Sequence, residues 1–358
     1  MSKNIEKLKK ELGYCWANEV ESSQRLSTGL PTLDIALGGG WPKGRISLIT
    51  GFKESGKSYL SYKAIAETHK DPETLAILLD AERAYTPQWG EAIGIDNTRL
   101  IVHRPITMEV AYNSALQMLS EFRPSVIVFD SLASLAPGEE IEKELGESRS
   151  RAGAAILTNT FLRMIFSLLN QWPKDASEPV IIMIQHLYMD PSVPYFRTRI
   201  RGGVGQEYMA ALILQTAQAE GRQSRLIETV KIKNQEIDRH VGWNFKWSIE
   251  KSRIGPSGIS GTYNLYTRNI EEIYKEGQSD DLETLIFWAV NFGLIEKHAS
   301  WYSWQEEKYQ GLEDLKAAIR ESGDILQNQV TPLLMDFYVG NGGLLAQYKE
   351  IEDVQEGG

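Results

Sequence analysis

Residues 46–58 read Ile-Ser-Leu-Ile-Thr-Gly-Phe-Lys-Glu-Ser-Gly-Lys-Ser, a short apolar run followed at once by a loop bounded by glycines. The part from Gly51 to Ser58 matches the pattern GxxxxGK followed by Ser or Thr, whose backbone N–H groups surround phosphate oxygens at the start of a helix. In this pattern Lys57 supplies a positive charge for the terminal phosphates, and the Ser58 hydroxyl is a ligand for Mg²⁺. The apolar run before the loop and the helical stretch after it favour a phosphate site over an idle glycine turn.

Short apolar runs alternate with helical patterns on both sides of this loop. The apolar runs cover 46–50, 75–79, 100–102, 126–129 and 180–184. The helical stretches cover 57–69, 108–122 and 152–169. This order predicts an α/β fold with a mostly parallel central sheet covered by helices on both faces. Such sheets bind ligands at the carboxyl ends of their strands, so the residues that follow the apolar runs are the candidates for a site.

Two carboxylates follow apolar runs in this way. Asp130 comes directly after Phe129 and is predicted to hold Mg²⁺ opposite Ser58. Glu82 follows the run that ends at Leu79 and is predicted to orient or deprotonate the attacking water. A single acid at such a place is more often a helix cap or a surface residue. Two of them beside a phosphate loop favour ATP hydrolysis.

The composition is that of a globular protein with an acidic balance. The chain has 358 residues, 42% of them hydrophobic, and a formal net charge of −10, so it can bury a sizeable core and does not coat nucleic acid through bulk positive charge. A nucleic-acid site must then be a local basic patch. Cys15 is the single cysteine, which excludes an internal disulfide and agrees with a reducing compartment. No apolar run reaches about 18 residues and the charged N-terminus does not read as a signal peptide, so a cytoplasmic protein without membrane contact is predicted.

A series of short motifs resembles the RecA family of recombinases. The motifs are, in order, Ser27-Thr-Gly29, Leu33 to Gly38, the phosphate loop, Asp80-Ala-Glu82, Asp130-Ser131, Leu145 to Ser148, Gly202-Gly203, Leu294 to Lys297 and Trp301-Tyr-Ser303. They span nearly the whole chain. His186, where the family has glutamine, and the stretch from Glu250 to Arg253 are more similar to the phage recombinases of UvsX type. A bacterial cell, with a phage gene as the origin, is therefore the predicted setting.

The resemblance implies roles for individual residues. Glu82 matches the catalytic glutamate, His186 matches the sensor of the γ-phosphate, and Trp89 matches the aromatic that stacks on adenine, with a core tryptophan as the alternative. Lys251 and Arg253 match a basic pair that reaches the ATP of the adjacent subunit. The implied catalytic set is Glu82, Lys57, Lys251 and Arg253. The implied ATP-binding set is Gly51, Phe52, Lys53, Glu54, Ser55, Gly56, Lys57, Ser58, Tyr59, Trp89, Asp130 and His186, with Ser58 and Asp130 as the Mg²⁺ ligands.

Two loops are candidates for binding single-stranded DNA. The segment after His186 runs from Leu187 to Arg201 and interleaves arginines, which suit phosphates, with aromatic side chains that stack on bases. Read alone, a basic loop is more often a solvated segment or an anion site, but its place after the candidate sensor favours DNA. The second loop, Pro137 to Gly153, carries arginines after an acidic stretch and matches the other DNA loop of the family. The candidate DNA contacts are Arg149, Arg151, Tyr195, Phe196, Arg197, Arg199, Arg201, Gly202 and Gly203.

Four regions are predicted along the chain. They are a short N-terminal oligomerisation segment at 1–28, which contains a helix from Ile5 to Leu12, a RecA-like ATPase core at 29–268, a small α+β C-terminal domain at 269–335 and an acidic tail at 336–358. The resemblance also places the N-terminal helix and Tyr208 at the contact between subunits. On sequence alone, the helix docks on its own chain about as readily as on a neighbour.

The predicted function is ATP-dependent homologous recombination. Subunits with bound ATP and Mg²⁺ are expected to form a helical filament on single-stranded DNA and to catalyse pairing and strand exchange with homologous double-stranded DNA. The alternative is a RecA-fold protein that binds ATP and assembles with regulatory partners without exchanging strands. A hexameric helicase of the same fold is disfavoured by the C-terminal region and the N-terminal helix.

Overall fold

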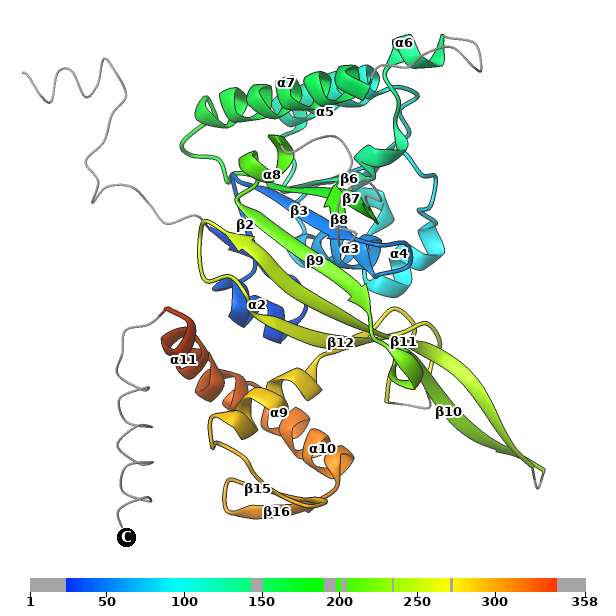
Figure 1. Cartoon of the computed structure of the whole chain (residues 1–358), viewed down its shortest axis with the longest axis vertical. Coiled ribbons are helices and arrows are strands. Elements are labelled where there is room, and N and C mark those ends of the chain that lie inside the picture. Colours follow the sequence, from blue (N-terminus) through cyan, green and yellow to red (C-terminus); the bar gives the residue numbers. More distant parts are fainter. Residues whose placement is uncertain are drawn as a thin grey trace, which may run out of the picture.

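A computed structural model describes residues 24–142, 151–189, 198–200, 205–233, 235–270 and 273–339. The predicted N-terminal helix, residues 143–150 and 190–197 of the two predicted DNA loops, residues 201–204 and the acidic tail beyond residue 339 lie outside the described residues. Figure 1 shows a large sheet with helices on both of its faces, and a smaller helical part joined to one end of that sheet.

Six parallel strands form the centre of the large sheet. They are β3 (Ile46–Gly51), β4 (Ala76–Asp80), β5 (Leu100–His103), β6 (Val126–Asp130), β7 (Val180–Met189) and β9 (Leu212–Gln218). The order along the sheet is β13-β12-β11-β9-β3-β7-β6-β4-β5, so β3 lies between β7 and β9. Strands β3, β4 and β6 are buried along their whole length, which agrees with their apolar sequences. The predicted α/β class with a mostly parallel sheet is confirmed.

Alternate residues of these strands enter two separate hydrophobic clusters. Ile49, Leu78 and Val128 pack on the side of α3 (Lys57–Thr68), which α4 (Pro87–Ile93) adjoins. Leu48 and Ile127 pack on the opposite side with α5 (Met108–Phe122) and α7 (Arg151–Asn170). The period of two along each strand therefore divides the core into two layers, one on each face of the sheet. The short elements nearby are β1 (Arg25–Leu26), α2 (Pro31–Leu37), β2 (Trp41–Pro42), α6 (Gly138–Ile141), β8 (Thr198–Ile200) and α8 (Gly205–Met209).

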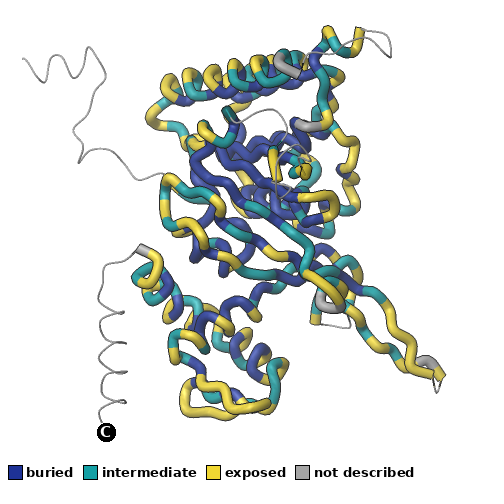
Figure 2. Tube along the Cα trace, in the orientation of Figure 1, coloured by how far each residue is buried: buried dark blue, intermediate teal, exposed yellow. Residues whose placement is uncertain are grey.

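Antiparallel strands extend the sheet beyond β9. They are β11 (Gln235–Ser252), β12 (Ser260–Tyr266) and β13 (Ser279–Asp280), and β10 (Arg225–Ile232) pairs with the first half of β11. The β10–β11 ribbon projects from the body of the protein in Figure 1, and most of its outer part is exposed in Figure 2. The sheet continues past residue 268, at which the sequence predicted the core to end, because the chain returns to pair with β12.

The small C-terminal part combines helices with a three-stranded antiparallel sheet. Its elements are α9 (Leu282–Asn291), β14 (Glu296–His298), β15 (Trp301–Trp304), β16 (Glu307–Gln310), α10 (Leu312–Ser322) and α11 (Ile325–Val339). Its buried residues, such as Trp288 and Leu326, belong to the same cluster as α2 and α3, so it is packed onto the part of the protein that contains the large sheet. Helix α11 continues through the predicted start of the tail at residue 336 and ends at Val339.

Candidate nucleotide site

The phosphate loop joins β3 to α3, as its sequence predicts. Gly56 adopts a φ of 85°, a left-handed conformation that favours glycine. A Cβ added at Gly51 would lie 2.4 Å from Ser55 Oγ and 2.5 Å from the Thr216 carbonyl oxygen, so only glycine fits there. These two positions explain why the loop can bring backbone N–H groups close to a phosphate group at the N-terminus of a helix.

The ammonium group of Lys57 lies inside this loop. Lys57 is only 5% exposed, and its Nζ donates a hydrogen bond to the Phe52 carbonyl oxygen at 2.5 Å. Burial lowers the pKa of Lys57, while the carboxylates of Asp130 and Glu82 act in the opposite direction. The loop thus holds a largely desolvated cation, which is suited to binding a phosphate oxygen.

The carboxyl group of Asp130 lies at the end of β6 and is 2% exposed. Tyr62 Oη donates to Asp130 Oδ2 at 3.1 Å, and Asp130 also shares a hydrogen bond with Ser58. Burial raises the pKa of Asp130 to about 6, against the effect of these hydrogen bonds. The structure therefore brings together Ser58 and Asp130, the two predicted Mg²⁺ ligands, and their oxygens are the donor type that Mg²⁺ prefers.

Glu82 lies in a turn that follows β4. Arg83 next to it has a left-handed φ of 56°, and the Ala84 N–H donates to Asp80 Oδ1 at 2.9 Å. Asp80 is itself buried and lies 3.1 Å from Arg104 Nε. The Ala81 N–H donates to the Asp130 carbonyl oxygen at 2.8 Å, so the ends of β4 and β6 are joined.

Glu82 Oε1 accepts three hydrogen bonds. The donors are Ser131 Oγ at 2.5 Å, Ser134 Oγ at 2.8 Å and His186 Nε2 at 2.8 Å. Burial acts to raise the pKa of Glu82, but these hydrogen bonds outweigh it, and the net pKa is lowered. An ionised carboxylate can only accept, so Nε2 of His186 carries the proton in this contact.

The contact between His186 and Glu82 joins two residues that the sequence assigned to separate tasks. His186 is the predicted sensor and Glu82 the predicted catalytic base, and they are 104 positions apart. The hydroxyls of Ser131 and Ser134 were not among the site residues predicted from the sequence. Their place directly after β6, at the same edge of the sheet as Glu82, is the signal that identifies them.

Trp89, the predicted adenine-stacking residue, lies on α4. Its side chain is partly buried and packs against the hydrophobic cluster that contains α3. Helix α4 contacts α3, the helix that the phosphate loop opens. Stacking on adenine remains a prediction for Trp89.

Lys251 and Arg253, the predicted intersubunit cations, bind the backbone of α8 within one protomer. Lys251 Nζ donates to the Glu207 and Tyr208 carbonyl oxygens, and Arg253 Nη2 donates to the Tyr208 carbonyl oxygen. The Tyr208 side chain, predicted to lie at a subunit contact, is 70% exposed. The structure does not bring this pair to Glu82 of the same chain.

The described part of the predicted DNA loops is short. Arg199 lies on β8, which pairs antiparallel with the end of β7, directly after His186. Arg151 begins α7, and only its backbone is described. The remaining DNA candidates, which lie outside the described residues, are Arg149, Tyr195, Phe196, Arg197, Arg201, Gly202 and Gly203.

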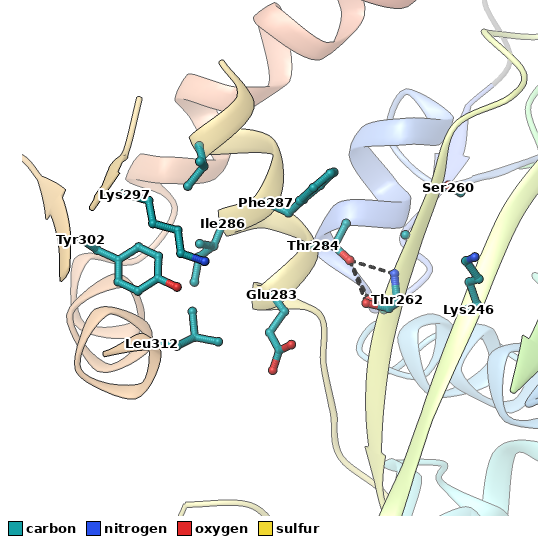
Figure 3. A pocket seen from close by; sticks show the side chains of 12 residues that line it. Lys246, Ser260, Thr262, Glu283, Thr284, Ile286, Phe287, Lys297, Tyr302 and Leu312 are labelled. Carbon is teal, nitrogen blue, oxygen red and sulfur yellow. Dashed lines mark hydrogen bonds between the residues drawn. The ribbon is translucent and has the colours of Figure 1, made fainter. Parts of the chain in front are cut away.

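A groove of about 430 Å³ lies away from the phosphate loop, between β11 and β12 and the C-terminal elements (Figure 3). Its side chains include Lys246, Phe287 and Lys297, and α9 is fixed to β12 there by the Thr262 N–H donating to Thr284 Oγ1 at 2.8 Å. It contains none of the predicted site residues. Within the described ranges, no cluster of His, Cys, Asp and Glu side chains could by itself hold a metal ion. None of the described helices combines the length and the apolar composition that crossing a membrane requires.

The strand–loop–helix unit and the parallel sheet define a P-loop α/β protein. Comparison with known proteins gives the family. A model of the RecA N-terminal domain matches residues 4–242, about two thirds of the chain. The chain therefore belongs to the RecA family, which consists of ATP-binding recombinases, and the predicted family is confirmed.

Individual relatives agree with this assignment. Protein RecA of Chlorobium limicola is 31% identical over 307 residues, which cover 85% of this chain and 80% of the relative. Protein RecA of Legionella pneumophila is 30% identical over 319 residues, which cover 87% of this chain and 84% of the relative. The DNA repair protein recA homolog 1, chloroplastic, of Arabidopsis thaliana is 29% identical over 320 residues, with 87% and 67% covered. A phage origin stays a prediction.

Proposed function

We propose that this chain is a DNA-dependent ATPase that assembles as a helical filament on single-stranded DNA and exchanges strands with homologous double-stranded DNA. The observation that carries the proposal is the hydrogen bond between His186 and Glu82. It connects the residue suited to activating water with β7, the strand that leads into the basic loop. The proposed place of action is the bacterial cytoplasm.

The phosphate loop and two oxygen ligands would hold ATP with Mg²⁺. The loop backbone and Lys57 bind phosphate oxygens, and Ser58 and Asp130 hold the metal ion. When bound, Mg²⁺ neutralises charge on the phosphate oxygens. A proton competes with the cation for the carboxylate of Asp130, whose pKa is raised to about 6, so metal binding is expected to weaken as the pH falls below about 6.

Glu82 and His186 would act together on hydrolysis. Ionised Glu82 can orient a water molecule and accept its proton. One oxygen of Glu82 accepts hydrogen bonds from three donors, one of which is His186. His186 Nε2 carries a single N–H, so a phosphate oxygen that accepts it leaves Glu82 with a free acceptor site for water. Sensing the nucleotide and activating the base then become one event.

The arginine-bearing segments would hold DNA. Arg199 and Arg201 supply cations for backbone phosphates, and Tyr195 and Phe196 supply surfaces for bases. Lys251 and Arg253 would approach the ATP of the neighbouring subunit, which makes hydrolysis depend on assembly. Base pairing between the strands supplies the sequence specificity.

The alternative is an ATP-binding assembly protein of the same family that does not exchange strands. The test is ATP hydrolysis with and without single-stranded DNA, followed by strand exchange between homologous substrates. Lys57→Ala serves as the control, because it removes the cation of the phosphate loop. Hydrolysis stimulated by DNA together with strand exchange supports the proposal. Nucleotide binding without stimulation or exchange favours the alternative.

A further inference from the structure

Two glutamine side chains form a buried hydrogen bond between β7 and α8. Gln185 Nε2 donates to Gln206 Oε1 at 2.6 Å, and each residue is only 1% exposed. Gln185 lies on β7 and Gln206 is the second residue of α8. Burying two amide groups costs free energy unless they form hydrogen bonds, so the contact between Gln185 and Gln206 strongly restricts where α8 can lie.

The position of Gln185 connects this pair to the nucleotide site. It precedes His186, and successive side chains of a strand point to opposite faces of the sheet. Ile181 and Met183, which share a face with Gln185, pack in the cluster of α5 and α7. Ile184, which shares a face with His186, packs in the cluster of α3. Strand β7 therefore carries the contact with Glu82 on one face and the contact with α8 on the other.

The position of α8 connects the pair to DNA. The helix begins at Gly205, directly after the segment that contains the predicted DNA contacts Arg201 to Gly203. It has only five residues, too few to be stable alone, so its tertiary contacts determine its place. Gly205 packs closely on α7, because a Cβ there would lie 2.0 Å from Asn159 Oδ1.

The C-terminal end of α8 is bound by Lys251 and Arg253, the predicted intersubunit cations. The carbonyl oxygens of Glu207 and Tyr208 accept hydrogen bonds from Lys251 and Arg253. The short helix is thus attached by Gln206 to the nucleotide site of its own chain and by its backbone to cations expected to reach the neighbouring nucleotide.

We propose that the Gln185–Gln206 hydrogen bond is a positioning contact that transmits the nucleotide state from β7 to α8 and so to the DNA-binding loop. This inference rests on the proposed function. A shift of His186 towards a phosphate moves the adjacent backbone of β7, and the buried amide bond makes α8 follow. Both glutamines are buried, so their role in this coupling is to fix the position of α8 relative to β7.

The test compares Gln206→Leu, Gln185→Leu and the variant with both changes in the full-length protein. Thr158→Val is the matched control, because it removes the buried 2.8 Å hydrogen bond between Thr158 and Tyr112 on the same face of the sheet. Three quantities are measured: the melting temperature, ATP hydrolysis without DNA, and the affinity for a fluorescent oligonucleotide with ATP and with ADP.

Gln206→Leu is expected to leave DNA-free hydrolysis within about twofold of the original and to reduce the ratio of ATP-state to ADP-state affinity by about tenfold or more. Gln185→Leu should reduce the ratio in the same way. Gln206→Leu removes the acceptor of the buried Gln185 amide, so the variant with both changes should regain melting temperature relative to Gln206→Leu. It should not regain the affinity ratio.

Three results would overturn the inference. They are an unchanged ratio of ATP-state to ADP-state affinity in Gln206→Leu, a double variant that regains this ratio together with its melting temperature, and a reduction of the ratio in Thr158→Val as large as that in Gln206→Leu. A different result identifies failure of the proposed function. If the unmodified protein binds the oligonucleotide equally with ATP and ADP, there is no coupling for α8 to transmit, and the proposed function and this inference both fall.

Discussion

Replacing the buried carboxyl group of Asp130 by an amide is expected to stabilise the nucleotide-free protein and to impair hydrolysis. Burial raises the pKa of Asp130 from 3.8 to about 6, so its ionised form is disfavoured in the folded state. The amide in Asp130→Asn has the same shape, and its oxygen can still accept the hydrogen bond from Tyr62. The variant loses the unfavourable charge together with the anionic ligand for Mg²⁺.

The magnitude follows from the difference in pKa between the folded and unfolded chains. A rise of about two pKa units corresponds to about 3 kcal/mol in the free energy of unfolding. The carboxyl group of Asp130 binds its proton more tightly in the folded chain than in the unfolded chain. This tighter proton binding stabilises the fold fully below the unfolded pKa, and the stabilisation is lost as the pH rises through about 6. The free energy of unfolding of Asp130→Asn should exceed that of the original protein by up to about 3 kcal/mol at pH 8 and by about half as much at pH 5.

The assay is urea unfolding of both proteins without nucleotide at pH 8 and pH 5, with ATP hydrolysis measured in parallel. Asp281→Asn is a matched control. Asp281 is 5% exposed, burial raises its pKa to about 6, and it accepts hydrogen bonds from Thr32 N and Oγ1, between α2 and α9. This control should show the same pH-dependent gain in stability with normal hydrolysis.

Two results would refute this reasoning. Burial would not disfavour the carboxylate if Asp130→Asn were less stable than the original at pH 8. The same would hold if the difference in the free energy of unfolding between the two proteins did not vary with pH. A stabilised variant with full hydrolysis would mean that Asp130 is not a metal ligand.

The other predictions concern hydrolysis, assembly and DNA binding. Glu82→Gln should retain ATP binding and lower hydrolysis by about a hundredfold or more, because the general base is lost; normal turnover would remove Glu82 from the mechanism. Lys251→Ala should keep ATP binding by single protomers and lower DNA-stimulated hydrolysis by about a hundredfold; equal losses with and without DNA would contradict a role between subunits. Arg199→Ala combined with Arg201→Ala should reduce the slope of log affinity against log salt by about 1.4, and an unchanged slope would mean that these arginines do not touch phosphates.

The sheet and the phosphate loop could be predicted because their signals are local. An apolar run followed by the loop of Gly51 to Ser58 specifies a strand, a turn and a helix within thirteen residues. The place of Asp130 follows from the same logic, since it ends a buried strand. These features depend on neighbours in sequence and on the general rules of parallel sheets.

The contacts between distant residues could not be predicted. The bond between His186 and Glu82 depends on how β4, β6 and β7 are ordered in the sheet. The bond between Gln185 and Gln206 depends on where α8 packs, and a glutamine in an apolar strand gives no sign of its partner. The length of the β10–β11 ribbon could not be predicted either, because it projects without a core that would impose strict alternation of apolar and polar residues.

The coupling between nucleotide and DNA can be measured as the affinity of the unmodified protein for a single-stranded oligonucleotide with ATP, with ADP and without nucleotide at one salt concentration. We expect binding to be at least about tenfold tighter with ATP, because phosphate contacts by His186 and Lys57 control the strand that leads to the arginines. Equal affinity under all three conditions would contradict this expectation.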